Sequence, residues 1–140
     1  MRGINVGCEA YILRDGKLLL GKRGRVDGEG TWGLPGGHLD FMERADEGLI
    51  RELEEETGIK VSASAIILLA LTDDLRPNRN EHYLHITFKV DIGSQQPKLL
   101  EPDKCSEWAW FDPDSLPEIF PFQAKIFDTI RTGSTYAKTG

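Results

Sequence analysis

Three glutamates stand close together near the middle of the chain, and their spacing suits the binding of a metal ion. Glu52, Glu55 and Glu56 occupy positions i, i+3 and i+4, so on a helix their carboxylates share one side and can converge. Like charges held this close repel one another, and a bound cation offsets the repulsion. A cluster of oxygen ligands favours a hard divalent ion, so we expect Mg²⁺, which Mn²⁺ can replace, rather than Zn²⁺.

The segment around these glutamates is acidic as a whole. Residues 40–56 hold eight acids and two bases, a net charge of −6, and the complete chain also sums to −6. A glutamate-rich helix face is usually solvated surface, and we interpret Glu47 and Glu54 in that way. Glu43, one turn earlier, is either a charge that favours the start of the helix or an outer ligand of the metal.

A magnesium centre of this kind indicates a phosphorylated substrate. Mg²⁺ in proteins usually keeps several waters and is shared between a few carboxylates and substrate phosphates. It neutralises charge in the transition state and lowers the pKa of a bound water that attacks phosphorus in line. Arg51 can pair with a neighbouring glutamate and hold it in a ligating orientation. Gly36 and Gly37 allow the backbone to turn sharply before the helix.

The spacing resembles a known signature. The pattern starts at Gly37 and continues with Glu43, Arg51-Glu52-Leu53, Glu55-Glu56 and Gly58-Ile59, which matches every fixed position of the Nudix box over residues 37–59. The rest of the chain is similar to the MutT-type nucleotide triphosphate diphosphatases of the Nudix hydrolase family. The stretches that carry this similarity are residues 20–23, 34–39, 82–83, 101–105 and 108–110.

This resemblance implies a fold, a reaction and a set of site residues. The fold is the Nudix fold of the α/β (α+β) class, in which a mixed β-sheet is sandwiched between helices. The reaction is hydrolysis of a nucleoside triphosphate, which includes modified or oxidised ones, to a nucleoside monophosphate and pyrophosphate. The implied metal ligands are Glu52, Glu55 and Glu56, and with Arg51 they form the expected catalytic set.

The resemblance also indicates where the substrate is bound. Arg23 matches an arginine that contacts substrate phosphates in the family, and we expect Gly37 to lie against the substrate as well. His38 follows the glycine pair, where it either hydrogen-bonds the nucleotide or is a structural histidine. Asp40 and Met42 depart from the usual family residues, Glu and Gly, and leave the substrate side of the pocket less defined.

The general base has more than one candidate. It is either Glu52, inside the box, or a carboxylate from a loop, such as Glu101 or Glu107. Aromatic side chains are more often core residues than platforms for a nucleobase, although one of them can face the base. The aromatic residues considered are Trp32, Tyr83, Trp108, Trp110 and Phe111.

The elements that must position these residues follow from the hydrophobic pattern. We expect a helix from Glu43 to Thr57, ended by Gly58. Ala45, Leu49 and Leu53 form an adjoining apolar stripe, so the glutamates should lie where the helix meets its sheet. The other expected elements are a hairpin of strands 4–13 and 17–23, a short strand at 31–37, strands at 59–71, 82–92 and 106–111, a polar loop at 72–81, a second helix at 122–131 and a frayed tail from 132.

Length and composition predict one domain, residues 1–140. Hydrophobic residues make up 39% and charged residues 29% of the 140 positions, which is typical of a soluble globular protein. No apolar run approaches the roughly 20 residues that span a bilayer, so we expect a cytoplasmic protein without membrane contact. Cys8 and Cys105 should be free thiols. The negative charge argues against a nucleic-acid polymer as partner, and a homodimer is the expected assembly by resemblance.

Two other functions remain compatible with the sequence. The box alone also permits hydrolysis of another nucleoside diphosphate derivative, such as ADP-ribose, a dinucleoside polyphosphate or a sugar nucleotide. A nucleotide-sensing module could keep the fold without turnover. The intact set of Arg51, Glu52, Glu55 and Glu56 counts against that second alternative.

Overall fold

In the computed structural model, which describes residues 3–138, the larger β-sheet lies at the centre of the molecule. Its strand order is β5-β1-β7-β6, with β5 at Gly36–His38, β1 at Asn5–Tyr11, β7 at Glu81–Val90 and β6 at Ile66–Arg76. β1 and β7 run parallel, whereas β1–β5 and β6–β7 are antiparallel pairs. The sheet is therefore mixed, as predicted.

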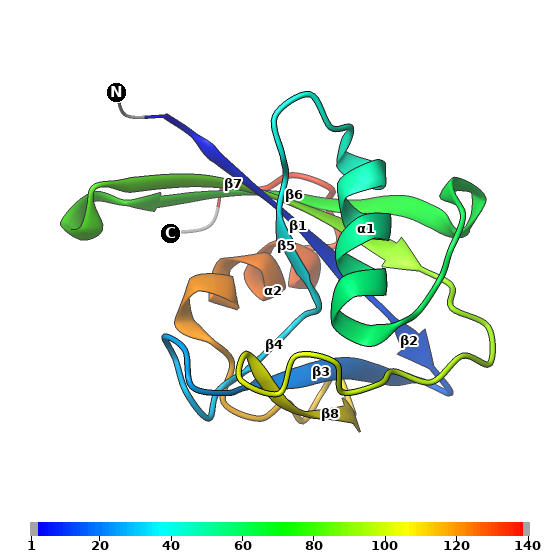
Figure 1. Cartoon of the computed structure of the whole chain (residues 1–140). Coiled ribbons are helices and arrows are strands. Elements are labelled where there is room, and N and C mark those ends of the chain that lie inside the picture. Colours follow the sequence, from blue (N-terminus) through cyan, green and yellow to red (C-terminus); the bar gives the residue numbers. More distant parts are fainter. Residues whose placement is uncertain (1–2, 139–140) are drawn as a thin grey trace.

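A smaller sheet lies beside the larger one and is built around β3 (Lys17–Arg23). β3 pairs with β2 (Leu13–Arg14), β4 (Trp32–Gly33) and β8 (Cys105–Phe111), in each case antiparallel. Figure 1 shows β3 and β8 at the bottom, below the larger sheet. The predicted hairpin is thus only partly correct. The first predicted strand divides at Ile12, whose side chain is fully buried in the core. Of its two parts, β1 belongs to the larger sheet and only β2 pairs with β3.

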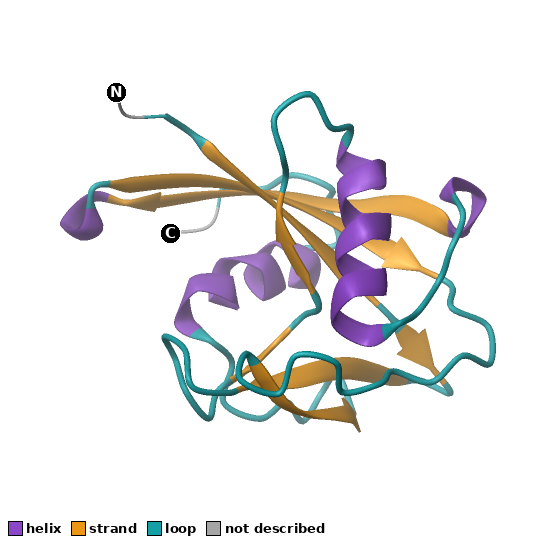
Figure 2. Cartoon of the chain, viewed as in Figure 1, coloured by secondary structure: helices purple, strands orange, loops and turns teal. Residues whose placement is uncertain are grey.

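Two α-helices cover opposite faces of the larger sheet (Figure 2). α1 (Ala45–Thr57) packs Leu49 and Leu53 against Cys8 and Ala10 of β1. α2 (Ala124–Arg131) lies against β6 on the other face, where Thr72 donates a hydrogen bond to Thr129 over 3.1 Å. This confirms the predicted arrangement of a mixed sheet between helices.

The helix boundaries differ slightly from those predicted. α1 begins two residues later, at Ala45, because Arg44 still has an extended backbone with φ −73° and ψ 152°. The predicted end is confirmed, since Gly58 adopts a left-handed φ of 74° and its N–H donates to the Glu54 carbonyl. α2 is preceded by the 3₁₀ turn η3 (Pro121–Gln123), so its first regular residue is Ala124 rather than Phe122.

The predicted polar loop at 72–81 is wrong, and the strand at 59–71 is misplaced. The chain forms the 3₁₀ turn η1 (Ala63–Ala65), and β6 then continues to Arg76 before the short turn η2 (Pro77–Arg79) leads into β7. Polar residues remain in the strand because Thr72 and Asp74 are buried on the face that α2 covers. The polar sequence therefore marks a buried polar layer and not a loop.

The predicted frayed tail is wrong for part of its length. The Leu71 N–H donates to the Thr135 carbonyl over 2.8 Å, and the Tyr136 hydroxyl donates to Asp73. The segment therefore docks on the outer edge of β6. Residues 139–140 of the predicted tail and residues 1–2 of the predicted domain lie outside the described range.

Two hydrophobic clusters form the core. One joins α1 to the larger sheet through Leu49 and Leu53, and the other joins α2 to the smaller sheet through Leu18, Leu20 and Ile126. The cysteines are free, as predicted, with Cys8 in the first cluster. Within residues 3–138, no helix combines the length and the apolar character needed to cross a membrane.

Candidate active site

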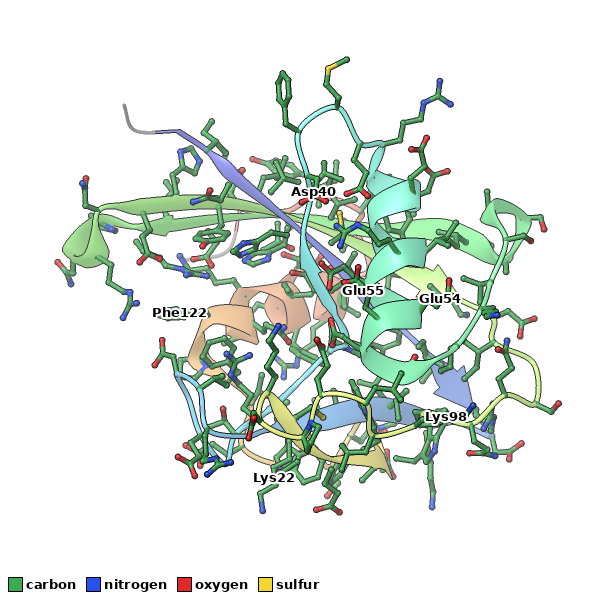
Figure 3. All side chains as sticks on the ribbon, in the orientation of Figure 1. Lys22, Asp40, Glu54, Glu55, Lys98 and Phe122 are labelled. Atoms are coloured by element: carbon green, nitrogen blue, oxygen red, sulfur yellow. The ribbon has the colours of Figure 1, made fainter. Side chains whose placement is uncertain are left out.

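Two of the predicted metal ligands share a cavity beside α1. Glu52 and Glu56 line a cavity of about 400 Å³, together with Glu101 from the loop before β8. Glu55 lies outside this lining: its side chain is 53% exposed and its Oε2 lies 3.4 Å from Nη1 of Arg51. In Figure 3, Glu54 and Glu55 lie on different sides of α1. The structure thus brings Glu52 and Glu56 together and leaves Glu55 beside Arg51, outside the lining.

Strand β5 brings its backbone directly against these glutamates. A Cβ atom at Gly37 would lie 2.4 Å from Cδ of Glu52, so only glycine leaves room for that carboxylate. The Gly36 N–H donates to Oε1 of Glu56 over 3.3 Å. A Cβ atom at Gly36 would lie 2.0 Å from the carbonyl oxygen of Cys8, so glycine also allows β5 to approach β1. The glycine pair therefore builds one wall of the cavity.

Arg51 holds the side chains of Glu43 and Glu52 in place through hydrogen bonds. Its Nε and Nη2 donate to the two carboxylate oxygens of Glu43 over 2.8 and 3.0 Å, and its Nη1 donates to Oε1 of Glu52 over 2.9 Å. The hydrogen bonds from Arg51 and from the Asp40 N–H hold the pKa of Glu43 at about 2, although desolvation opposes them. Glu43 precedes the helix and is the partner of Arg51, which in turn orients Glu52.

The electrostatics of Glu56 are unusual for a carboxylate. Burial, followed by the negative charge of Glu52, raises the pKa of Glu56 well above its ordinary value of 4.5, and the Gly36 N–H lowers it only in part. Two half-buried carboxylates thus face each other, and a proton or a cation must offset their repulsion. Within residues 3–138, no three His, Cys, Asp or Glu side chains are already assembled in the arrangement of a metal site.

Basic side chains line the same cavity. Lys22, Arg23 and Lys104 reach it from β3 and from the loop before β8. Arg23 is held in place because its Nε donates to the Asp27 carbonyl over 2.6 Å and its guanidinium carbon lies 3.8 Å from the centre of the Phe120 ring. The predicted substrate contacts Arg23, Gly37 and His38 all belong to the lining. An anion bound here would meet both positive side chains and the acidic pair.

The candidates for the general base are placed differently. Glu52 and Glu101 line the cavity, and the charge of Glu101 contributes to the raised pKa of Glu56. Glu107 lies on β8 opposite Lys22 of β3, is exposed and does not belong to the lining. Of the three candidates, Glu52 therefore belongs to the acidic pair, Glu101 lies near it and Glu107 lies outside the lining.

A second cavity of about 300 Å³ adjoins the first. Arg23, Gly36, Gly37, His38 and Gln123 line both, so the two cavities form one cleft with an acidic end and a second end under the β6–β7 hairpin. Tyr83 and Phe122 belong to the second end, and Figure 3 shows Phe122 close to the start of α2. Of the aromatic residues considered from the sequence, Tyr83 and Trp108 line the cleft, whereas Trp32 packs edge-on against Phe111.

A chain of charged side chains lies at the second end and was not predicted. His85 Nδ1 lies 2.8 Å from Oε1 of Glu9, and His85 Nε2 lies 3.0 Å from Oδ2 of Asp74. Arg76 donates from Nη2 to the same Asp74 oxygen over 2.6 Å and from Nη1 to Oε2 of Glu81 over 3.1 Å. We call Glu9, His85, Asp74 and Arg76 the buried charge chain.

Hydrogen bonds shift the pKa values of His85 and Asp74 within the buried charge chain. Burial lowers the pKa of His85, but the bonds to Glu9 and Asp74 outweigh it and raise the pKa above its ordinary value of 6.5. Burial raises the pKa of Asp74, but the bonds from Arg76 and His85 outweigh it and lower the pKa. A signal for the buried charge chain existed in the sequence, because Glu9 and His85 each interrupt an otherwise apolar strand pattern, whereas Asp74 lies in the polar stretch that was predicted as a loop.

Comparison with known proteins identifies the family. A family model described as the NUDIX domain matches residues 1–130. The chain belongs to the NUDIX family. This confirms the resemblance inferred from the box and, with it, the predicted class of enzyme, a Nudix pyrophosphohydrolase.

Individual Nudix relatives cover most of this chain. The crystal structure of a MutT NUDIX hydrolase from Burkholderia pseudomallei has a TM-score of 0.81 and 34% identity, and the match covers 92% of this chain and 99% of that chain. An ADP-ribose pyrophosphatase from Methanocaldococcus jannaschii is 30% identical over 127 residues, which are 90% of this chain and 73% of the relative. The nucleoside triphosphatase NudI of Escherichia coli O139:H28 is 30% identical over 123 residues, with 83% and 86% covered. This Nudix protein thus has relatives with different named substrates.

Proposed function

We propose that this Nudix protein hydrolyses a nucleoside triphosphate, including modified or oxidised ones, to a nucleoside monophosphate and pyrophosphate with the help of Mg²⁺. The observation that carries the proposal is the half-buried Glu52–Glu56 pair in a cavity that also presents Lys22, Arg23 and Lys104. The glutamates can bind a metal ion and the basic side chains can bind phosphate groups. Because both face the same cavity, together they suit a metal-bound polyphosphate.

The residues present fit a divalent ion. The donors are all carboxylate oxygens, which Mg²⁺ and Mn²⁺ prefer, and the raised pKa of Glu56 reflects burial and the negative charges of Glu52 and Glu101, which a cation would offset. Glu52 and Glu56 would hold the ion, joined by Glu55 when its exposed side chain turns from Arg51. A bound ion supplies neutralisation of phosphate charge and a lower pKa for a coordinated water.

The protein's own residues bind the substrate, orient it and accept a proton from the attacking water. Arg23, Lys22 and Lys104 contact the phosphate oxygens and fix the phosphorus in the cleft. Arg51 keeps Glu52 in one orientation through the 2.9 Å hydrogen bond to Oε1. That bond engages Glu52, which favours Glu101 as the group that takes the proton from the attacking water. Water oxygen then bonds to phosphorus, the bridging P–O bond breaks, and pyrophosphate leaves with the electron pair.

ADP-ribose is the second candidate substrate. The specific observation in its favour is the 30% identity to the ADP-ribose pyrophosphatase of M. jannaschii over 90% of this chain. The two substrates are separated by their products, because ADP-ribose yields AMP and ribose 5-phosphate without pyrophosphate.

The test is a panel of nucleoside triphosphates, ADP-ribose, dinucleoside polyphosphates and sugar nucleotides, assayed with Mg²⁺ for pyrophosphate and for phosphomonoester products. We expect pyrophosphate from at least one triphosphate and loss of turnover with a chelator. Calorimetric titration with Mn²⁺ gives a second readout, in which binding disappears in the Glu52→Gln/Glu56→Gln double variant. Turnover of ADP-ribose alone, or equal Mn²⁺ binding in the double variant, would overturn the proposal.

Three further expectations complete the proposed function. We propose a cytoplasmic location, a homodimer and a single domain over residues 1–140. Light scattering coupled to size-exclusion chromatography tests the dimer, since a mass near twice the 15.7 kDa of the chain is expected. Calorimetric unfolding in one cooperative transition supports the single domain.

A further inference from the structure

The proposed reaction leaves the buried charge chain without a role. Glu9, His85 and Asp74 come from β1, β7 and β6, and their side chains are 7%, 6% and 4% exposed. Burial of charged groups is costly even when they are paired, so it seldom serves stability alone. The position of the buried charge chain at the second end of the cleft suggests a role in binding a ligand.

One oxygen atom of the buried charge chain lacks the hydrogen bond that a buried carboxylate needs. Oε1 of Glu9 is bonded to His85, but Oε2 is shielded from solvent and has no partner in the part of the chain that the structure describes. Glu9 is one of the residues that line the second cavity. Because buried polar groups are almost always hydrogen-bonded, the free oxygen indicates a donor that enters with a ligand.

The surroundings hold Glu9 in one position. His85 lies between two carboxylates, which raise its pKa, and when it is protonated its two ring nitrogens donate to both of them. A Cβ atom at Gly7 would lie 2.8 Å from Oε1 of Glu9 and 3.1 Å from Nδ1 of His85, so the site depends on glycine there. The carboxylate is therefore oriented before any ligand binds.

The cavity wall above Glu9 is flat and aromatic. The guanidinium carbon of Arg76 lies 4.3 Å from the centre of the Tyr83 ring and 3.8 Å from the centre of the Phe122 ring. Tyr83 in turn stacks on His85 at an interplanar angle of 12°. The donors of Arg76 bond to Asp74 and Glu81, and Oε2 of Glu9 stays without a partner among the described residues. Aromatic side chains beside a buried acceptor without a partner suit a planar heterocycle that carries N–H groups.

We propose that Glu9 determines base specificity by accepting a hydrogen bond from an exocyclic amino group of the nucleobase. This inference rests on the proposed function, because it places the phosphates at the acidic end and the base at the second end of the same cleft. A base with a carbonyl oxygen in place of the amino group would set two acceptors against each other. Such a base is disfavoured by the loss of one hydrogen bond to a charged group and by repulsion.

The experiment compares bases that differ only in this group. The pairs are CTP and UTP, ATP and ITP, and GTP and XTP, in which an amino group is replaced by a carbonyl at one ring position. The wild-type protein should favour the amino member in at least one pair by about tenfold or more in kcat/KM. Equal kcat/KM within all three pairs overturns the inference and needs no variant.

The Glu9→Gln variant tests the residue. His85 donates to the amide oxygen, so the amide nitrogen takes the place of Oε2 and presents a donor instead of an acceptor. The amino-to-carbonyl ratio should fall by about tenfold or more, whereas Glu54→Gln, the same change on the exposed side of α1, should leave the ratio unchanged. An unchanged ratio in Glu9→Gln, with a wild-type thermal transition, contradicts the role of Glu9.

A binding measurement separates this inference from the proposed function. Dissociation constants are measured by calorimetry for CMP and UMP, AMP and IMP, and GMP and XMP, which require no hydrolysis. If no triphosphate is turned over but the amino member still binds more tightly through Glu9, the proposed reaction fails and the base site stands. If triphosphates are turned over and neither ratio depends on Glu9, the base site fails and the reaction stands.

Discussion

The two ends of the cleft both bury carboxylates, but they compensate the negative charge in opposite ways. At the buried charge chain, Arg76 and His85 donate to Asp74, and its pKa falls below the ordinary value although burial raises it. At the acidic end, burial and the negative charges of Glu52 and Glu101 raise the pKa of Glu56 well above the ordinary value, although Arg23 is also near. One end is neutralised by the protein, whereas the other needs a cation from outside.

This difference separates two uses of a buried acid. A carboxylate with internal partners is already at its lowest energy and can serve as a fixed recognition group. A carboxylate with acidic neighbours is destabilised until a ligand arrives, so part of the folding free energy is given up for binding. The comparison predicts that equal chemical changes at the two ends have opposite consequences for activity and stability.

The largest expected effect is on turnover at the acidic end. The Glu56→Gln variant should lose about 100- to 1000-fold in kcat, because the amide removes a ligand charge without a change in volume. Its thermal unfolding temperature should stay the same or rise, since repulsion from Glu52 disappears. Steady-state kinetics at saturating Mg²⁺ and calorimetric unfolding measure both, with Glu54→Gln as the matched exposed control. A wild-type rate in Glu56→Gln would refute the assignment.

The same type of change at the other end should act on stability. Asp74→Asn removes the negative charge that His85 and Arg76 share and leaves them a neutral amide oxygen, so the free energy of unfolding should fall by about 3 kcal/mol. Urea denaturation at neutral pH measures the loss. Asp128→Asn is the control, because its pair with Arg131 is about half exposed and should contribute less than about 0.5 kcal/mol. Equal stabilities of the two variants would show that His85 and Arg76 do not depend on the charge of Asp74.

A smaller effect is expected where the backbone meets the acidic pair. Gly37→Ala places a Cβ atom 2.4 Å from Cδ of Glu52, so that carboxylate must move out of its orientation. We expect about a tenfold loss in kcat/KM with only a small change in stability, because the side chain and not the core is displaced. Gly3→Ala, where nothing lies within 4 Å, is the control. Unchanged kinetics in Gly37→Ala would mean that Glu52 needs no fixed orientation.

The acidic end was the part of the site most open to prediction from the sequence. Helical spacing alone places Glu52 and Glu56 one turn apart, and the sequence also indicated that Arg51 would pair with a glutamate. The separation of Glu55 from the pair was not predictable, because it depends on where Arg51 finds its strongest partners. Glu43 was expected at the start of the helix, yet it lies before Ala45 and binds Arg51 with both oxygens.

The second end required knowledge of the sheet. Glu9 and His85 are 76 positions apart and meet only because β1 and β7 run parallel and adjacent. The polar residues of β6 looked like a loop, since the rule that strands alternate apolar and polar residues assumes an apolar core. Here the buried face itself is polar, and Thr72 and Asp74 satisfy their groups through Thr129, His85 and Arg76. These residues therefore come together through long-range strand pairing, which the local sequence pattern does not show.

The smallest effect, and the sharpest comparison, is in the pH dependence of stability. The folded pKa of His85 is raised above 6.5, so its contribution is complete below that pH and is lost as the pH rises through the folded pKa. The folded pKa of Glu56 is raised above 4.5, so stability also falls as the pH rises from there through its folded pKa. Urea denaturation across this range, with and without Mg²⁺, separates the two.

Mg²⁺ should abolish the component that begins near pH 4.5, because the ion replaces the proton between Glu52 and Glu56. It should leave the component above pH 6.5, which depends on partners inside the protein. The His85→Gln variant should lack that second component in both conditions. If Mg²⁺ removed both components, or if His85→Gln kept the wild-type slope above pH 6.5, the two ends would not compensate their charge independently.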